Sequence, residues 1–414
     1  MKKYSLGALV AAGLLVGGLS AGSASAADLG GNCCADLEER IAELEATTAR
    51  KGNRKVSLTI SGWVGQQVVG WDDGYEQNAY VGDIGATLSS HFKFTGQATI
   101  SPGWYAGYVI HVEARNENSL GLTQSGPGVN SLGLLQSFWF IKSDSLGKLS
   151  VGLQSQASDN TAILVDGSGS LVPANWVAFD YNNFFIRNSA NTGSSIKWGA
   201  IGGCVGGGAI GDCNGLTQNV IRYDSPTFGG FSVSASWGED DMWDVAARYA
   251  GEFNGFKFAA AGAYNELTDE NLGVPNGDTF QYFQVGAYLE HVPTGLFVYG
   301  AYGNAQYDIR TGESETWYGK AGLRERWSAL GHTVLYGEYE NNQADGTAFV
   351  QNSNVVGGAE TSSDFNLWGV GVVQEIDAAA MSVWLSYRHL DYSDNSAANY
   401  EDFQYIKAGA LINF

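Results

Sequence analysis

The sequence predicts an all-β fold, a 16-stranded antiparallel β-barrel that spans a membrane and covers residues 56–414. Three observations predict this fold. Apolar and polar residues alternate with a period of two, as in strands with one apolar and one polar face. The strands are about ten residues long, which suits a tilted strand that crosses a bilayer. Short and long connections alternate between the strands.

The segment 104–116 shows the alternation clearly. Trp104, Tyr108 and Val112 share its apolar face, whereas Glu113 and Arg115 lie on the other. All six Pro residues fall in connections, as expected because proline cannot donate a hydrogen bond within a sheet. The predicted strands are 56–71, 85–100, 104–116, 134–143, 147–158, 216–225, 230–239, 242–253, 256–267, 279–292, 296–308, 316–328, 332–342, 365–377, 380–392 and 403–414.

Alternation by itself is also typical of a soluble antiparallel sheet, so a secreted soluble β protein is the alternative. Strand length and aromatic residues favour the membrane. In hydrocarbon every backbone N–H and C=O needs a partner, so the sheet must close into a barrel. The aromatic residues near strand ends resemble the girdles at the two membrane surfaces. They are Trp71, Trp104, Trp237, Trp243, Trp317 and Trp327.

Residues 1–26 have the pattern of a secretory signal peptide. Lys2 and Lys3 precede a short apolar segment, and residues 24–26 read Ala-Ser-Ala, which is typical of a cleavage site. The apolar segment is too short for a transmembrane helix. A signal peptide before a barrel predicts the outer membrane of a Gram-negative bacterium.

Residues 27–55 are predicted to form a periplasmic segment with one short helix. Leu37, Ile41, Leu44 and Thr48 recur at heptad spacing. Two heptads are too short to be stable alone. Either several copies of the chain associate here as a coiled coil, or the helix lies on its own chain.

Charge and motifs exclude several functions. The chain has 22 basic and 43 acidic residues and a net charge of −21, whereas nucleic-acid binding needs a basic surface. Residues 206–211 match G-x-G-x-x-G but lie in a predicted loop, so they do not predict a dinucleotide site. Neither hydrolase motifs nor zinc-like Cys and His spacing occur. We therefore expect neither an enzyme nor a cofactor, although a barrel hydrolase with a site on its loops is an alternative.

Three segments carry a family resemblance. Residues 34–63 run from Cys-Ala-Asp-Leu-Glu-Glu-Arg to Thr-Ile-Ser-Gly-Trp, residues 219–226 read Asn-Val-Ile-Arg-Tyr-Asp-Ser-Pro, and the last strand ends at Phe414. Together they resemble the alphaproteobacterial (rhizobial-type) outer-membrane general porin family. The resemblance implies a homotrimer in outer-membrane lipid that lets small hydrophilic solutes diffuse passively. It also implies that Phe414 belongs to a signal for the outer-membrane assembly machinery.

A sixteen-stranded barrel is too wide for its wall side chains to fill, so an aqueous lumen remains. General porins place an inward-folded constriction loop after the fifth strand, and the longest connection, 159–215, lies there. An aromatic and apolar stretch from Trp176 to Ile186 could pack this loop against the wall. The alternative is an external lid over the barrel mouth. The candidate charged residues of the constriction loop are Asp159, Asp166, Asp180 and Arg187.

Opposite an acidic loop, the wall is expected to carry basic residues. Opposed charges across a narrow pore create a transverse field that orders water and disfavours apolar solutes. Alternatively, these side chains form ion pairs along the wall, such as Glu113 with Arg248. Ion selectivity stays open, and a substrate-specific sugar or ion channel is the second hypothesis. The candidate pore-wall residues are Lys93, Glu113, Arg115, Arg248, Lys320, Arg324, Arg326 and Arg388.

The cysteines suggest one disulfide bond. Cys204 and Cys213 bracket a Gly-rich stretch, and in an oxidising periplasm they are predicted to pair. Cys33 and Cys34 are adjacent, and they either link chains near the coiled coil or stay free.

Overall fold

The computed structural model describes residues 55–85, 87–117, 121–126, 128, 130–175, 180–188, 193–203, 217–238, 241–268, 277–350 and 360–414. The predicted signal peptide, the predicted helix within 27–55 and all four cysteines lie outside the described residues.

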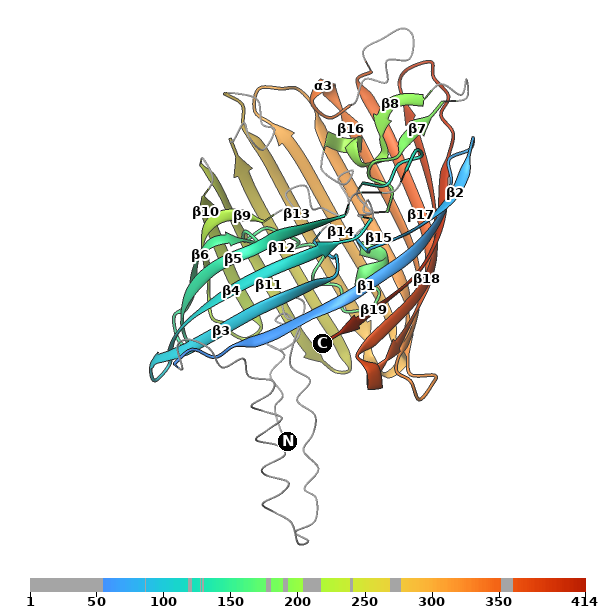
Figure 1. The fold of residues 1–414 in the computed structure, drawn as a ribbon. Helices are drawn as coiled ribbons and strands as arrows, with labels where there is room; N and C mark the ends of the chain where they lie inside the picture. The colour runs from blue at the N-terminus through green and yellow to red at the C-terminus, as the bar shows by residue number, and fades with distance from the viewer. Residues whose placement is uncertain are drawn as a thin grey trace.

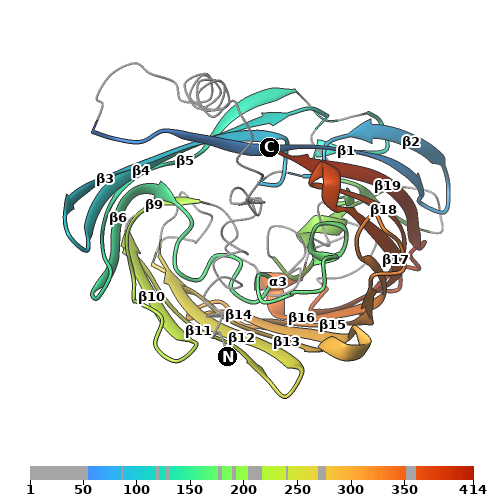
Figure 2. The ribbon, with the colours of Figure 1, turned by 90° about the horizontal axis from the view of Figure 1, so that it is seen from below.

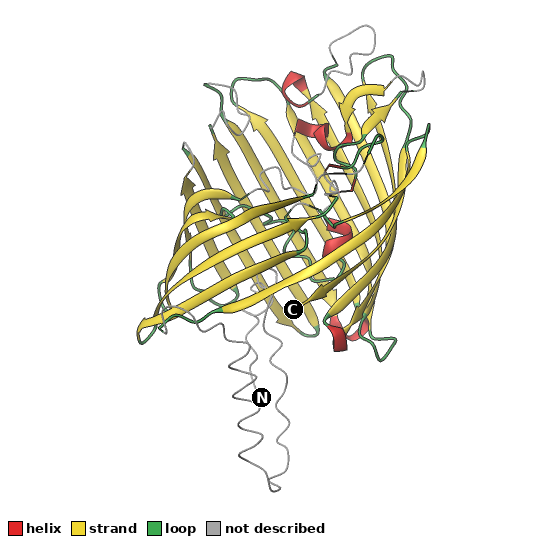
Figure 3. Cartoon of the chain, in the orientation of Figure 1, coloured by secondary structure: helices red, strands yellow, loops and turns green. Residues whose placement is uncertain are grey.

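An antiparallel sheet closes into a barrel, as Figures 1 and 3 show. Its 17 strands occupy 16 positions, because β2 and β3 pair with different ends of β1 and share one position. The strands are β1 (Thr59–Asp72), β2 (Gln77–Gly82), β3 (His91–Ser101), β4 (Trp104–Arg115), β5 (Ser131–Ser143), β6 (Gly147–Gln154), β9 (Gln218–Asp224), β10 (Phe231–Gly238), β11 (Met242–Phe253), β12 (Phe256–Leu267), β13 (Phe280–His291), β14 (Leu296–Tyr307), β15 (Glu313–Glu325), β16 (Thr333–Asp345), β17 (Ser362–Ile376), β18 (Met381–Asp394) and β19 (Phe403–Asn413).

The first and last strands close the barrel. Trp63 on β1 lies opposite Asn413 on β19, and the ladder continues to Asp72 opposite Gln404. Beyond the ladder, the Gly62 N–H donates to the Phe414 carbonyl at 3.1 Å, and the Phe414 N–H donates to the Gly62 carbonyl at 3.0 Å. Closure removes the unpaired edges that an open sheet would expose.

The remaining elements are short. β7 (Phe185–Arg187) and β8 (Gly193–Lys197) form a separate two-stranded sheet. The helical turns are η2 (Leu171–Asn175), η4 (Trp198–Gly203), η7 (Val292–Thr294), α3 (Gly346–Phe349) and η8 (Asp377–Ala379). No helix among the described residues has the length and apolar character needed to cross a membrane.

The two faces of each strand differ in composition, as β13 illustrates. Phe283, Val285 and Leu289 are exposed on the outside of the barrel, whereas Gln284 and Glu290 are buried on the inside. An apolar exterior and a polar interior are typical of a transmembrane barrel. The predicted all-β, sixteen-stranded barrel is therefore confirmed.

Several sequence predictions need correction, and one is the predicted strand 147–158, which ends at residue 154. The described residues 85 and 87–90 are not part of a strand, because the Asp83 side chain accepts the N–H groups of Gly85 and Asn116 and turns the chain away after β2. The predicted strand 316–328 ends at residue 325 and begins earlier, at residue 313. Trp71 is only 3% exposed and does not belong to an outer girdle, since it packs against Phe184 inside the barrel.

Candidate functional site

The segment between β6 and β9 contacts the inner faces of distant strands. Figure 2 shows parts of it drawn within the ring of strands. Since β6 and β9 are themselves neighbours, with Gln154 opposite Gln218, this segment leaves the sheet and returns to the adjacent position. Its described residues are held to the wall by three polar contact groups and one apolar cluster.

The first contact group surrounds Lys320 on β15. Its ammonium group lies 2.5 Å from the Asp166 carboxylate and donates to Ser170 Oγ at 2.9 Å and Asn175 Oδ1 at 2.6 Å. The side chains of Lys320 and Asp166 are both fully buried. Three acceptors satisfy the three N–H donors of an ammonium group, which makes the buried charge tolerable.

The second contact group surrounds Asp180. Its carboxylate accepts from Lys407 Nζ at 2.5 Å, from Gln67 Nε2 at 2.7 Å and from the Tyr405 hydroxyl at 3.1 Å. These partners come from β19 and β1, so Asp180 ties the segment to the strands that close the barrel.

Arg388 on β18 lies beside this group. It binds Glu338 on β16 through two hydrogen bonds, of 2.7 and 2.9 Å, and also donates to the Tyr405 hydroxyl and to the carbonyl of Ala174. Two parallel hydrogen bonds fix the plane of a guanidinium group. Arg388 therefore joins two strands to the segment through one fully buried side chain.

The third contact group holds residues 157–162. The Asp244 carboxylate accepts from the Ser158 N–H and hydroxyl, both at 2.7 Å. The Gln284 side chain donates to the Ser158 carbonyl and accepts from the Ala162 N–H, each at 2.9 Å. Arg248 donates to the carbonyl of Ala157 at 2.7 Å. Side chains of β11 and β13 thus satisfy the backbone of a chain without regular structure.

Three described residues of the apolar stretch pack against the wall. Tyr181, Phe184 and Ile186 are almost fully buried in a cluster with Phe365 and Phe403 of the wall. Trp176 lies outside the described residues.

The other predicted site residues lie apart from these three groups. Arg187 pairs with Asp73 in the turn after β1, at 2.7 Å. Arg115 pairs with Glu113, at 3.1 Å, so the suggested pair of Glu113 with Arg248 is wrong. Arg324 pairs with Glu375 of β17, at 2.9 Å.

Arg326 and Lys93 have different surroundings. Arg326 lies beyond the end of β15 and pairs with Asp377, with both side chains half exposed. Lys93 lines a cavity in the barrel interior.

Sequence reasoning did not single out Gln67, Asp244, Gln284 or Lys407 as partners of the segment. Each occupies an inward-facing position of its strand, so alternation identifies the face. Alternation does not identify the height along the barrel axis at which the segment meets the wall. That height determines which inward-facing side chains contact the segment.

Two carboxylates outside the spanning strands, one in the segment and one beside Arg187, have shifted pKa values. Burial raises the pKa of Asp159 to about 6, against the opposing effects of Ser155 and Arg222. Burial also acts to raise the pKa of Asp73, but the Glu76 N–H and the Arg187 guanidinium outweigh it and bring the pKa below its ordinary value.

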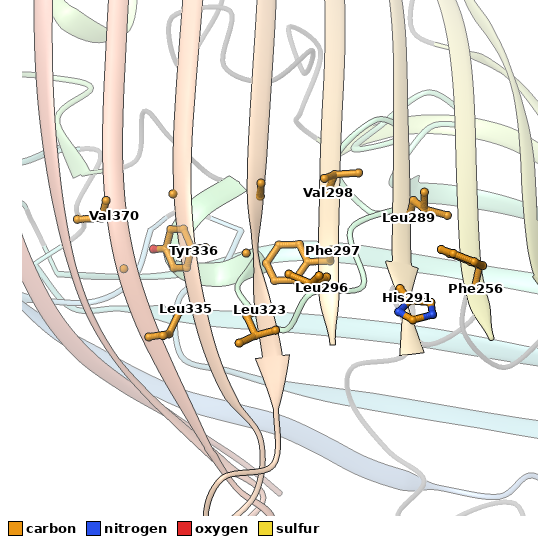
Figure 4. Close-up of a pocket in the computed structure, with 14 residues that line it drawn as sticks. Phe256, Leu289, His291, Leu296, Phe297, Val298, Leu323, Leu335, Tyr336 and Val370 are labelled. Carbon is orange, nitrogen blue, oxygen red and sulfur yellow. The ribbon is translucent and has the colours of Figure 1, made fainter. Parts of the chain in front are cut away.

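Two pockets lie on opposite sides of the wall. A cavity of about 520 Å³ lies inside the barrel, between the segment and the inner face of the wall. A groove of about 810 Å³ lies on the outside, where Figure 4 shows Leu296, Leu323, Leu335 and Val370 on neighbouring strands. Within the described ranges, no group of three His, Cys, Asp or Glu side chains could hold a metal ion.

Comparisons with known proteins agree with this architecture. The Gram-negative porin family model matches residues 8–348. No curated protein matches the chain. An anion-selective porin from Comamonas acidovorans is 15% identical, with a TM-score of 0.54, and the match covers 87% of this chain and 100% of that one.

Two further solved structures share the fold. OmpT of Vibrio cholerae, folded in vitro, is 13% identical with a TM-score of 0.54, covering 89% of this chain and 99% of that one. OmpF of Salmonella typhi, in complex with daunomycin, is 14% identical with a TM-score of 0.51, covering 88% and 99%.

A closed barrel with an apolar exterior and a polar interior defines a transmembrane channel of the outer membrane. The chain belongs to the Gram-negative porin family and forms a general porin channel.

Proposed function

We propose that the segment 155–217 is an inward-folded constriction loop that sets the size limit of the channel for small hydrophilic solutes. The buried contact of Lys320 with Asp166, Ser170 and Asn175 carries this proposal. A lid outside the barrel mouth would not need charged partners on the inner face of β15.

The anchors explain how the aperture keeps its size. Lys320, Arg388, Lys407 and Asp244 hold the segment from four different strands, and the aromatic cluster around Phe184 packs its far part. A loop fixed at several points samples few conformations, so the gap that it leaves stays constant. A constant gap excludes solutes by size.

Two acidic side chains of the segment are in direct contact with basic side chains of the wall. Asp166 neutralises Lys320, and Asp180 neutralises Lys407. A contact pair projects a weaker field into water than two separated charges do. This supports a channel that sieves mainly by size at the loop.

Several further features complete the proposal. Residues 1–26 direct the chain to the periplasm and are removed, and 27–55 form a periplasmic segment that supports a homotrimer. Cys204 and Cys213 form a disulfide bond in the constriction loop. Residues 404–414, with Phe414 at the end, form the signal for the assembly machinery that inserts the barrel into outer-membrane lipid.

Planar-bilayer recording tests the constriction loop. Because Gln154 lies opposite Gln218, a short Asn-Gly turn can join β6 to β9 in place of residues 155–217. The shortened protein is expected to conduct more per channel and to admit larger sugars than the full chain. For a trimer, the conductance is expected to rise in groups of three steps.

Heat-modifiable migration on a gel is the control that the shortened barrel is folded. If the folded, shortened barrel conducts no more than the full chain, the loop does not constrict the channel. If the full chain leaves the bilayer silent, the channel assignment itself is wrong.

A further inference from the structure

The cavity of about 520 Å³ between the segment and the wall contains an imbalance of charge. Four basic side chains line it, namely Lys93, Arg248, Lys257 and Arg324. Three carboxylates also line it, namely Asp166, Glu290 and Glu375.

Each of these three carboxylates has a basic partner. Asp166 contacts Lys320, which does not line the cavity, at 2.5 Å. Glu375 binds Arg324 at 2.9 Å. Glu290 lies 3.7 Å from Lys257. After these pairs are formed, Lys93 and Arg248 are the two cations of the lining that pair with none of the lining carboxylates.

Lys93 has no acidic neighbour across the sheet. Its cross-strand partners are Ser61 on β1 and His111 on β4. The nearest carboxylate along β4, Glu113, lies opposite His91 and is bound to Arg115. The Lys93 charge is therefore not cancelled by a contact within the described part of the chain.

Arg248 is held by neutral groups. It donates to Ser234 Oγ and Thr161 Oγ1, both at 2.9 Å, and to the carbonyl of Ala157 at 2.7 Å. Neutral acceptors position the guanidinium group, and the carboxylates of Asp224, Asp244 and Asp159 act on it through space without a direct ion pair among the described residues.

An unsatisfied polar group lies beside Lys93. Both ring nitrogens of His111 are buried without a hydrogen-bond partner among the described residues, and the ring is 5% exposed. The His111 ring lies against the His91 ring, with 4.2 Å between the centroids, and both rings line the cavity. A buried donor without a partner costs free energy, which a ligand can recover by binding to it.

We infer that this cavity is a subsite for small oxyanions, which carry a carboxylate or a phosphate group, and that it gives the channel an anion preference despite its acidic composition. Lys93 and Arg248 supply the charge, and the His111 ring supplies a hydrogen-bond donor. The inference rests on the proposed passage of solutes past the loop. Local charge in a lumen, rather than net charge, selects the ions that pass.

Reversal potentials in a tenfold KCl gradient, together with block by inorganic phosphate, test the subsite. The full chain is expected to favour chloride, and added phosphate is expected to reduce its chloride current. Lys93→Gln and Arg248→Gln together are expected to lower the anion-to-cation permeability ratio by about threefold or more, and to weaken the block by phosphate. Lys93→Arg keeps the charge and is expected to preserve both properties.

Arg310→Gln provides a matched control, because Arg310 lies outside the cavity and is paired with Asp278. Its permeability ratio is expected to match that of the full chain. Three outcomes overturn the subsite: a cation-selective full chain, an unchanged ratio in the Lys93→Gln, Arg248→Gln variant, or an equal shift in Arg310→Gln. A silent bilayer instead overturns the proposed channel function, so the two failures are distinguishable.

Discussion

Lys320 on β15 and Asp166 on the segment after β6 form an ion pair of 2.5 Å in which both side chains are fully buried. The two residues are 154 positions apart in the chain. A buried charge is costly unless it is paired and its remaining hydrogen-bonding positions are satisfied. Ser170 and Asn175 meet that condition for Lys320. The pair therefore fixes where the segment meets the wall.

Lys320→Met is expected to destabilise the protein, because it leaves the Asp166 carboxylate buried without a cation. Removing one partner of a buried pair costs about 3 to 5 kcal/mol in the free energy of unfolding. Urea denaturation in detergent micelles, followed by tryptophan fluorescence, measures the loss. The double variant Lys320→Met, Asp166→Asn is expected to lose less than the sum of the two single variants.

Arg326→Gln is the comparison for that experiment, because its pair with Asp377 is half exposed. Exposed pairs contribute at most about 1 kcal/mol. Equal losses for Lys320→Met and Arg326→Gln would show that burial of the Lys320 pair has no energetic consequence.

Gly286→Val is expected to push the segment away from β13. A Cβ atom at Gly286 would lie 2.2 Å from the Ala162 carbonyl oxygen, which is backbone and cannot rotate aside. Single-channel conductance is expected to change, and proteases are expected to cut the displaced segment faster. Gly319→Ala is the control, since a Cβ atom there meets nothing within 4 Å. Unchanged conductance and proteolysis in a folded Gly286→Val barrel would contradict the contact.

Packing of the segment is expected to be more stable in mild acid. Burial raises the pKa of Asp159 to about 6, above its ordinary value of 3.8, so the packed segment binds this proton more tightly than the unpacked one. The contribution of Asp159 to the stability of the packed segment is therefore fully present below its ordinary pKa, and it is lost as pH rises through about 6. The shift at Asp73 has the opposite sign, and its contribution is lost only as pH falls below 3.8.

Limited proteolysis at about pH 5 and at about pH 8 checks this prediction, with slower cleavage of the segment expected at the lower value. Asp159→Asn removes the titrating group and is expected to reduce the difference. If Asp159→Asn keeps the full difference in cleavage rate between the two pH values, other titrating groups cause that difference.

Phe414→Ala is expected to lower the amount of barrel in the outer membrane more than the stability of the barrel once it is folded. The hydrogen bonds of Phe414 with Gly62 are made by backbone atoms, and the residue is 59% exposed. Truncation of the ring therefore leaves the closing hydrogen bonds intact. Outer-membrane yield and urea midpoint, measured on the same variant, separate the two effects. Equal loss in both would contradict a role in assembly.

Strand positions could be predicted from the sequence because alternation is local. The predicted strands 242–253 and 256–267 coincide with β11 and β12, where Asn254 and Gly255 form the tight turn between them. The prediction failed at the described residues 85 and 87–90, where the Asp83 side chain ends β2 through its own hydrogen bonds. Such a side-chain contact produces no periodic pattern in the sequence, so it could not be predicted from alternation.

Partners of the site residues could not be predicted, because pairing depends on three-dimensional position. Arg324 and Arg326 share a face in the alternation, yet Arg324 binds Glu375 on β17 while Arg326 lies past the strand end. Asp180 finds Lys407, which is 227 residues away. Barrel closure brings β19 next to β1. The path of the segment then brings Asp180 into contact with Lys407 on β19 and Gln67 on β1.

The sequence by itself determined that this chain is a transmembrane barrel, because the two faces of a strand meet different solvents and their residues must alternate. It also determined which side chains face the lumen. The tertiary structure decided which of those charges cancel, because electrostatic pairing requires contact within a few ångströms. Lys320 and Lys93 are both lysines on the inner face, but only Lys320 meets a carboxylate of the segment among the described residues.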